Sequence, residues 1–124
     1  MTAASESVMP DLLNETERPT WFSYPRHFVR AVDLNILNLD PWQLLEGKWL
    51  RVRLEGLAKR YPDRQLVPFF RDTSSDDIAC WETGKGERVQ IVHDFASPGW
   101  ECAGEFENFL DWYKATAEIA LDFE

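Results

Sequence analysis

The chain has 124 residues, 44% of them hydrophobic, and 22 acidic side chains against 13 basic ones give it a net charge of −9. That length supports one hydrophobic core and not two, and six Trp with eight Phe supply large buried surfaces, so we expect a single domain. The apolar runs are only a few residues long and the N-terminus lacks a basic-then-apolar layout, which excludes a membrane span and a secretory signal and favours a cytoplasmic protein.

The N-terminal segment is polar and acidic, and its prolines break any long helix. Residues 1–20 are therefore predicted to be a loosely ordered arm, and residues 21–124 to form the domain. The aromatic run WFSYP at 21–25 follows the arm and is a candidate anchor that attaches it to the core. After Pro25, the sequence predicts a short helix from His27 to about Asn35.

The next stretch contains two helix signals. Asp40-Pro41 favours a helix start, with Asp as the N-cap and Pro in the first turn, which Gly47 would interrupt. An amphipathic helix over 49–60, ended by Pro62, is predicted by charged residues on one side and apolar residues at helical spacing on the other, namely Leu50, Leu54, Leu57, Ala58 and Tyr61.

Three short apolar segments, at 66–70, 78–81 and 89–92, are rich in β-branched or aromatic residues and are predicted to be strands. Pro68 has no N–H to give to a neighbouring strand, so the first of them is expected at a sheet edge or at a bulge. The turn sequence TGKG at 83–86 predicts a hairpin between the second and third.

A last helix is predicted from near Ala103, with an aromatic face that packs on the sheet and consists of Phe106, Phe109, Leu110, Tyr113 and Ala117. The predicted core joins this face to the strands and the central helix through Leu54, Leu57, Phe69, Cys80, Ile91, Phe106, Phe109 and Leu110. Cys80 and Cys102 lack metal-site spacing, so free thiols are expected.

The order of segments from about residue 60 to 114 resembles the SUKH superfamily, the Smi/Knr-like group: LVPF, an acidic loop, DDIACWE, a Gly turn, VQIVHDF, SPGW, then FENFL. This chain departs from typical members in its long Trp-rich approach to the first strand and in lacking Asn-Gly after the first helix. The resemblance implies a single α+β domain with a mixed, mostly antiparallel sheet flanked by helices. It also implies a protein-binding role, as an immunity protein in bacteria or a regulatory scaffold in fungi.

The charge is unevenly distributed along the chain. Residues 26–71 carry nine basic against five acidic side chains, whereas residues 72–124 carry three against thirteen. Nucleic acid is disfavoured as a partner, because binding a phosphate backbone requires clustered cations. A basic protein, such as a nuclease-type toxin domain, is complementary to the acidic half. The alternative is that excess acid only keeps a small domain soluble.

Motifs that carry chemistry are weak in this chain. The acidic loop DTSSDD fails the EF-hand spacing, and its Asp72 and serines are expected to cap turn N–H groups. His93 and Asp94 are adjacent on a strand and point to opposite faces, so they cannot pair directly without a bulge. The chain has no G-x-S-x-G, and GKG lacks the rest of a phosphate loop. We predict no catalytic, metal or cofactor-binding residue.

Two functional hypotheses remain. The first is an immunity protein that occludes a cognate toxin domain, and the second is a regulatory or scaffolding module with an endogenous partner. Trp81 and Trp100 are each candidates for an interface anchor or for the core, and SPGW at 97–100 is predicted to seat Trp100. We expect a monomer or weak homodimer that binds neither nucleic acid nor membrane. The predicted partner-binding residues are Asp72, Asp76, Asp77, Glu82, Asp94, Trp100 and Glu101.

Overall fold

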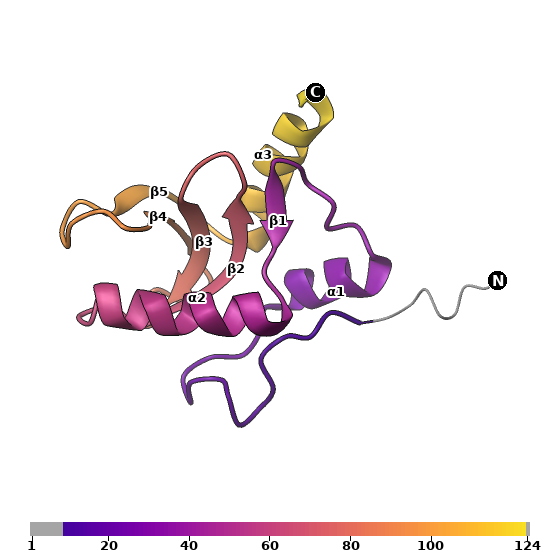
Figure 1. Cartoon of the computed structure of the whole chain (residues 1–124). Coiled ribbons are helices and arrows are strands. Elements are labelled where there is room, and N and C mark those ends of the chain that lie inside the picture. Colours follow the sequence, from indigo (N-terminus) through magenta and orange to yellow (C-terminus); the bar gives the residue numbers. More distant parts are fainter. Residues whose placement is uncertain (1–8, 124) are drawn as a thin grey trace.

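The computed structural model describes residues 9–123 and shows an α+β fold, as the sequence predicted. In chain order the elements are α1 (Arg26–Leu34), β1 (Trp42–Leu44), α2 (Gly47–Arg60), β2 (Leu66–Asp72), β3 (Asp77–Glu82), β4 (Val89–His93), β5 (Cys102–Phe106) and α3 (Phe109–Asp122) (Figure 1). The strands form one sheet in sequence order, and each pair of neighbours is antiparallel. The parallel component of the expected mixed sheet is therefore absent from the described residues.

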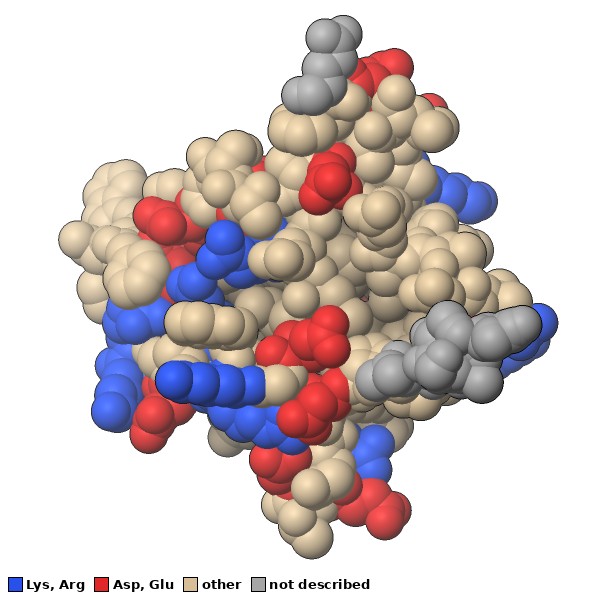
Figure 2. Space-filling view, turned by 45° about the vertical axis from the view of Figure 1, so that its right-hand side comes forward, with Lys and Arg blue, Asp and Glu red and all other residues tan. Residues whose placement is uncertain are grey.

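The helices divide between the two faces of the sheet. On one face, α1 and α3 contribute Phe28 and Phe109, which pack on Phe69 of β2. On the other face, α2 packs on β2 with Leu50 and Leu57 buried (Figure 1). We call the first the aromatic face and the second the α2 face. The surface of the molecule seen in Figure 2 carries Lys, Arg, Asp and Glu side chains interspersed rather than separated by sign.

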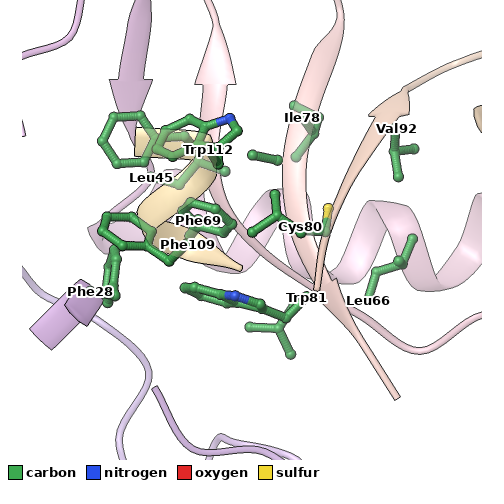
Figure 3. Packing of buried hydrophobic residues seen from close by; sticks show 14 of the residues in the cluster. Phe28, Leu45, Leu66, Phe69, Ile78, Cys80, Trp81, Val92, Phe109 and Trp112 are labelled. Carbon is green, nitrogen blue, oxygen red and sulfur yellow. The ribbon is translucent and has the colours of Figure 1, made fainter. Parts of the chain in front are cut away.

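The aromatic face is built around Trp81 of β3, which is 1% exposed. The ring of Phe69 stacks on it at 4.0 Å, and the ring of Phe28 meets it edge-on at 5.3 Å (Figure 3). Trp112 of α3 closes the cluster at 5.1 Å from Phe69. Aromatic pairs at such distances add to the stability that buried area alone provides.

Pro68 lies at an irregularity of β2, as its missing N–H predicted. The pairing with β3 shifts between Pro68 and Phe70, which is a bulge, and β1 pairs with β2 only from Phe70 onward. The bulge leaves consecutive Phe69 and Phe70 both close to Trp112, at 5.1 and 4.9 Å, although neighbouring residues of a regular strand alternate between faces. One irregularity therefore adds a second aromatic ring to the core.

The predictions for the first helix, the three strands and the hairpin are confirmed. Helix α1 ends at Leu34, and the C-cap Asn35 adopts the left-handed conformation (φ 54°) typical of a helix end. The turn between β3 and β4 places Gly84 and Gly86 at φ 80° and 59°, where a side chain would be strained. α2 covers the predicted range 49–60 and begins two residues earlier.

Two of the helix starts predicted from the sequence were wrong. Asp40 and Pro41, joined by a cis peptide bond, lead into the edge strand β1, and the helix begins only at Gly47, which has φ 62°. Residues 103–106, predicted to be helical, lie instead in strand β5, which spans Cys102–Phe106. This strand lies at the sheet edge with its side chains largely exposed, so it lacks the alternating apolar pattern that identifies a strand. Helix α3 begins at Phe109, and Asn108 caps it by accepting the N–H of Asp111 at 2.9 Å.

The predicted core is largely confirmed. Leu57, Phe69, Cys80, Ile91 and Phe109 are buried, and Leu54 and Phe106 pack against the buried cluster. Leu110 is only half-buried and Ala58 is exposed, so their assignment to the core faces was wrong. The predicted helix face omitted Trp112, which is 1% exposed and lies one turn after Phe109.

The described part of the N-terminal segment is attached to α2. Arg51 binds the carboxylate of Glu17 and donates to the carbonyl oxygens of Asp11 and Leu12. Leu13 is 4% exposed, and its N–H donates to the hydroxyl of Tyr24. Residues 1–8 of the predicted loose arm lie outside the described residues.

Candidate functional site

The predicted acidic loop lies beside the β4–β5 loop at one end of the sheet. The N–H of Asp94 donates to the carbonyl oxygen of Asp76 at 2.9 Å, and the His93 ring contacts the Asp77 carboxylate at 2.8 Å. Asp76 is exposed, and Trp100, in the β4–β5 loop, is 81% exposed. We call Asp72, Asp76, Asp77 and Trp100 the acidic end.

Hydrogen bonds within the loop fix the shape of the acidic end. One carboxylate oxygen of Asp72 accepts the N–H and the hydroxyl of Ser74, at 2.8 and 2.6 Å. The hydroxyl of Ser75 accepts the N–H of Asp77 at 3.1 Å. These are the turn caps predicted from the sequence, and they leave the Asp76 carboxylate as the one directed to solvent in this loop.

The two candidate tryptophan anchors have opposite positions. Trp81 is a core residue, whereas Trp100 projects from the β4–β5 loop. The predicted turn does form, because the Trp100 N–H donates to the Ser97 carbonyl, and of the two roles left open for Trp100 its exposure excludes the core. A large exposed aromatic side chain is a common energetic centre of protein contacts.

Two of the predicted partner-binding carboxylates, Glu82 and Glu101, are bound by one arginine. Arg64 donates from Nε and Nη2 to Glu82 at 3.0 and 2.7 Å, and from Nη1 to Glu101 at 3.0 Å. The second oxygen of Glu101 accepts the N–H of Gly99 at 2.6 Å. Burial acts to raise the pKa of Glu101, but these hydrogen bonds outweigh it and the pKa is lowered. Both side chains therefore stabilise the fold through these hydrogen bonds and are not free surface charges.

Asp94 is the most deeply buried acid of the predicted set, with 0% of its side chain exposed. It accepts Arg53 Nη1 at 2.7 Å and both Nε and Nη2 of Arg60 at 2.7 Å. Its remaining bond comes from the N–H of Phe95 at 2.8 Å. Burial acts to raise the pKa of Asp94, but the two arginines and this N–H outweigh it, and the pKa is lowered. The contact joins α2 to the β4–β5 loop.

Sequence reasoning missed the arginines because their partners lie 18 to 41 residues away along the chain. One signal was present: Arg53 and Arg60 are seven residues apart, so they lie on the same side of the predicted helix. The basic and acidic halves seen in the sequence are therefore partly neutralised by each other, and the acidic surface is smaller than the composition indicates.

Asp77 and His93 form a carboxylate–imidazole pair across β3 and β4, which sequence reasoning also missed. The two are directly opposite in the sheet, and the imidazole is 53% exposed. Among residues 9–123, no hydroxyl or thiol is hydrogen-bonded to the His93 imidazole, and no group of three side chains that could hold a metal ion occurs. His93 and Asp94 do not pair, as their alternation on the strand predicted.

A second surface lies where α2 passes β1. It encloses a hollow of about 1300 Å³, lined on the helix side by Trp49, Val52 and Gly56 and on the sheet side by Leu44 and Arg71. We call this hollow the α2 groove. Trp49 is 68% exposed and Val52 50%, on the side of the helix turned away from its buried leucines. Their spacing of three residues was the sequence signal for this surface. Figure 2 shows a hollowed area of mostly uncharged side chains with charged ones around it.

No protein-family model matches this chain, and neither the curated proteins nor the solved structures contain a significant match. In the part of the chain that the structure describes, no helix has both the length and the apolar character that crossing a membrane requires.

Proposed function

We propose that the protein is a non-enzymatic protein-binding module of the Smi/Knr-like type, and specifically an immunity protein. It acts in the cytoplasm by binding a cognate toxin domain with a basic, nuclease-type active site and occluding it. The binding surface is the acidic end.

The observation that supports this most is the combination of Asp76, Asp77 and Trp100 on adjoining loops at one end of the sheet. The exposed carboxylate of Asp76 and the partly exposed one of Asp77 complement a cleft built for phosphates and increase the rate of encounter. An exposed indole beside them supplies apolar contact area, which mainly determines the lifetime of a complex. Glu82, Asp94 and Glu101 act indirectly, because their ion pairs hold the loops in place.

The test uses the toxin encoded beside this gene. Asp76→Lys combined with Asp77→Lys should slow association at low salt by at least about tenfold, because electrostatic steering is lost. Trp100→Ala should instead speed dissociation. In cells that co-express the toxin, the native protein should permit growth and the charge-reversed variant should not.

The matched control is Glu118→Lys with Asp122→Lys, which changes the net charge equally on exposed positions of α3. This control should protect cells as the native protein does. If the two reversals were equivalent, the acidic end would not be the binding surface. If the neighbouring gene encoded no toxin and the protein rescued nothing, the immunity function would be wrong.

The second candidate is a regulatory scaffold with an endogenous partner, and the α2 groove favours it. Immunity requires only one occluding surface, whereas a scaffold joins partners on two. A native pull-down that returned a housekeeping protein, and lost it with Trp49→Ser but not with Trp100→Ala, would support the scaffold.

A further inference from the structure

The α2 groove carries apolar side chains that the fold does not use. Leu50 and Leu57 of α2 already cover the sheet, and both are 1% exposed. Trp49, Val52 and Gly56 recur at three- and four-residue spacing and form a second stripe along the side of the same helix, lining the groove. A second apolar stripe that remains open to solvent is typical of a surface that binds another chain.

The sheet side of the groove contains a cation that has no counter-ion among residues 9–123. Arg71 lies on β2 beside Gln43 of the edge strand, and its Nε is buried. Within residues 9–123 this guanidinium makes no hydrogen bond or ion pair, whereas Arg51, Arg53, Arg60 and Arg64 each bind a carboxylate. Only Nε of this guanidinium is buried without a partner, so a carboxylate brought by a ligand would bind the Nη atoms and form a charge-assisted contact that the fold does not supply.

Phe95 lines the groove with a ring that the backbone holds outward. Its φ of 68° lies in the left-handed region, which is unfavourable for a bulky residue, yet the side chain is 61% exposed. The Asp94 carboxylate accepts the Phe95 N–H, and the Arg60 guanidinium lies 4.1 Å from the ring centroid. The strain therefore does not serve core packing but fixes an aromatic surface at the groove.

The groove is also preorganised along its helix side. Asp94 holds both Arg53 and Arg60, and the absence of a side chain at Gly56 lets the Arg60 guanidinium lie against the helix. A Cβ at Gly56 would meet Arg60 Nη2 at 2.6 Å. A glycine costs about 1 kcal/mol in a helix interior, and here it accommodates the bound arginine.

We propose that the α2 groove binds a short segment of a partner protein whose apolar side chains pack on Trp49, Val52 and Phe95 and whose Asp or Glu carboxylate binds Arg71. Arg71 selects an acidic side chain at this one position, because it is the lining cation that has no internal carboxylate among the described residues. The lining also contains Asp33, Asp40 and Glu46, so further acidic residues in the segment are disfavoured. This site is separate from the acidic end, and it serves a different ligand chemistry.

The test selects displayed random peptides of about 12 residues, enough for three helical turns, against the full chain. Peptides that bind should combine apolar residues with an essential acidic one. Replacing that residue by its amide should weaken binding at least about tenfold, and Arg71→Gln should weaken the parent peptide equally. The amide peptide should bind the Arg71→Gln variant no more weakly than either change alone makes the pair bind, because both changes remove the same contact.

Arg30→Gln is the matched control, since Arg30 is exposed on α1 and does not line the groove. It should leave the dissociation constant unchanged. Trp49→Ser gives a second variant in case Arg71→Gln does not fold, and it should also weaken binding at least about tenfold.

Three results would overturn the proposal: selection without acidic enrichment, additive losses in the double variant, or binding that Trp49→Ser leaves intact. Self-association of the native chain that Trp49→Ser abolishes would assign the groove to a second copy and would overturn it as well. The charge-reversed acidic-end variant should bind the peptide normally, which separates failure of this site from failure of the proposed function.

Discussion

The two faces of the sheet are held by different forces. On the aromatic face, Trp81, Phe69 and Phe109 form a continuous cluster of ring contacts. On the α2 face, a few leucines are supplemented by arginines that bind distant parts of the chain. Arg60 of α2 binds Asp94 of the β4–β5 loop, and Arg64, in the loop after α2, binds Glu82 of β3. Apolar packing is non-directional, whereas a bidentate ion pair fixes geometry. The face that positions both candidate surfaces is therefore the one with specified side-chain geometry.

The largest loss of stability is expected from a substitution on the aromatic face. Phe109→Ala removes a 2% exposed ring that contacts Phe28, Phe69 and Trp112. The free energy of unfolding should fall by about 3 to 5 kcal/mol. Urea denaturation followed by tryptophan fluorescence is the measurement. The exposed Phe123 supplies the control, since Phe123→Ala should change stability by less than about 0.5 kcal/mol. Equal effects of the two substitutions would contradict the packing of α3.

A smaller loss is expected on the α2 face. Asp94→Asn removes the charge that Arg53 and Arg60 share, and the free energy of unfolding should fall by about 2 to 3 kcal/mol. The loss is limited because the arginine side chains are 19% and 29% exposed and can be rehydrated. The same denaturation assay applies. An unchanged midpoint would show that the ion pairs contribute nothing to holding α2.

Stability should also depend on pH through this face. The pKa of Asp94 is lowered in the folded state, as is that of Glu17, which its bond to Arg51 brings to about 2. A carboxyl with a lowered folded pKa stabilises the protein above its unfolded pKa and loses that contribution as pH falls. The denaturant midpoint of unfolding should drop as the pH falls from about 4.5 to 2. Over the same range, the difference in stability between the native protein and Asp94→Asn should become smaller. A difference that stayed constant down to pH 2 would contradict the lowered pKa.

The smallest change in stability is expected at Gly56, and its sign depends on the ion pair between Arg60 and Asp94. Gly56→Ala gains about 1 kcal/mol of helix propensity, but the new Cβ displaces the Arg60 guanidinium from its position. The substitution should therefore destabilise the native protein and stabilise the Asp94→Asn variant, in which Arg60 is free to move. Thermal melts of the four proteins in this cycle measure the coupling. Stabilisation in both backgrounds would mean that Arg60 is not held as described.

The features that were predicted correctly are those that local residue patterns in the sequence encode. The strands at 66–70 and 89–92 and the helix over 49–60 follow from apolar periodicity and turn residues, and so does most of the aromatic core. Strand β5 could not be predicted, because an exposed edge strand has no apolar alternation. Three of the predicted surface acids became ion-pair partners of arginines because such pairing depends on tertiary contacts that no local pattern records. Trp100 and Asp76 are exposed, whereas Trp81 and Asp94 are buried. Composition alone could not distinguish the exposed residues from the buried ones of the same type.

Hydrogen exchange followed by mass spectrometry tests the division between the two faces most directly, by comparing the native protein with Asp94→Asn. Faster exchange is expected in peptides that cover α2 and the loop at 94–101, because the tie between them is lost. Peptides that cover β2, β3 and α3 should keep their native protection under the same conditions. A uniform increase across all elements, or no increase in α2, would contradict the claim that ion pairs hold α2 independently of the aromatic core.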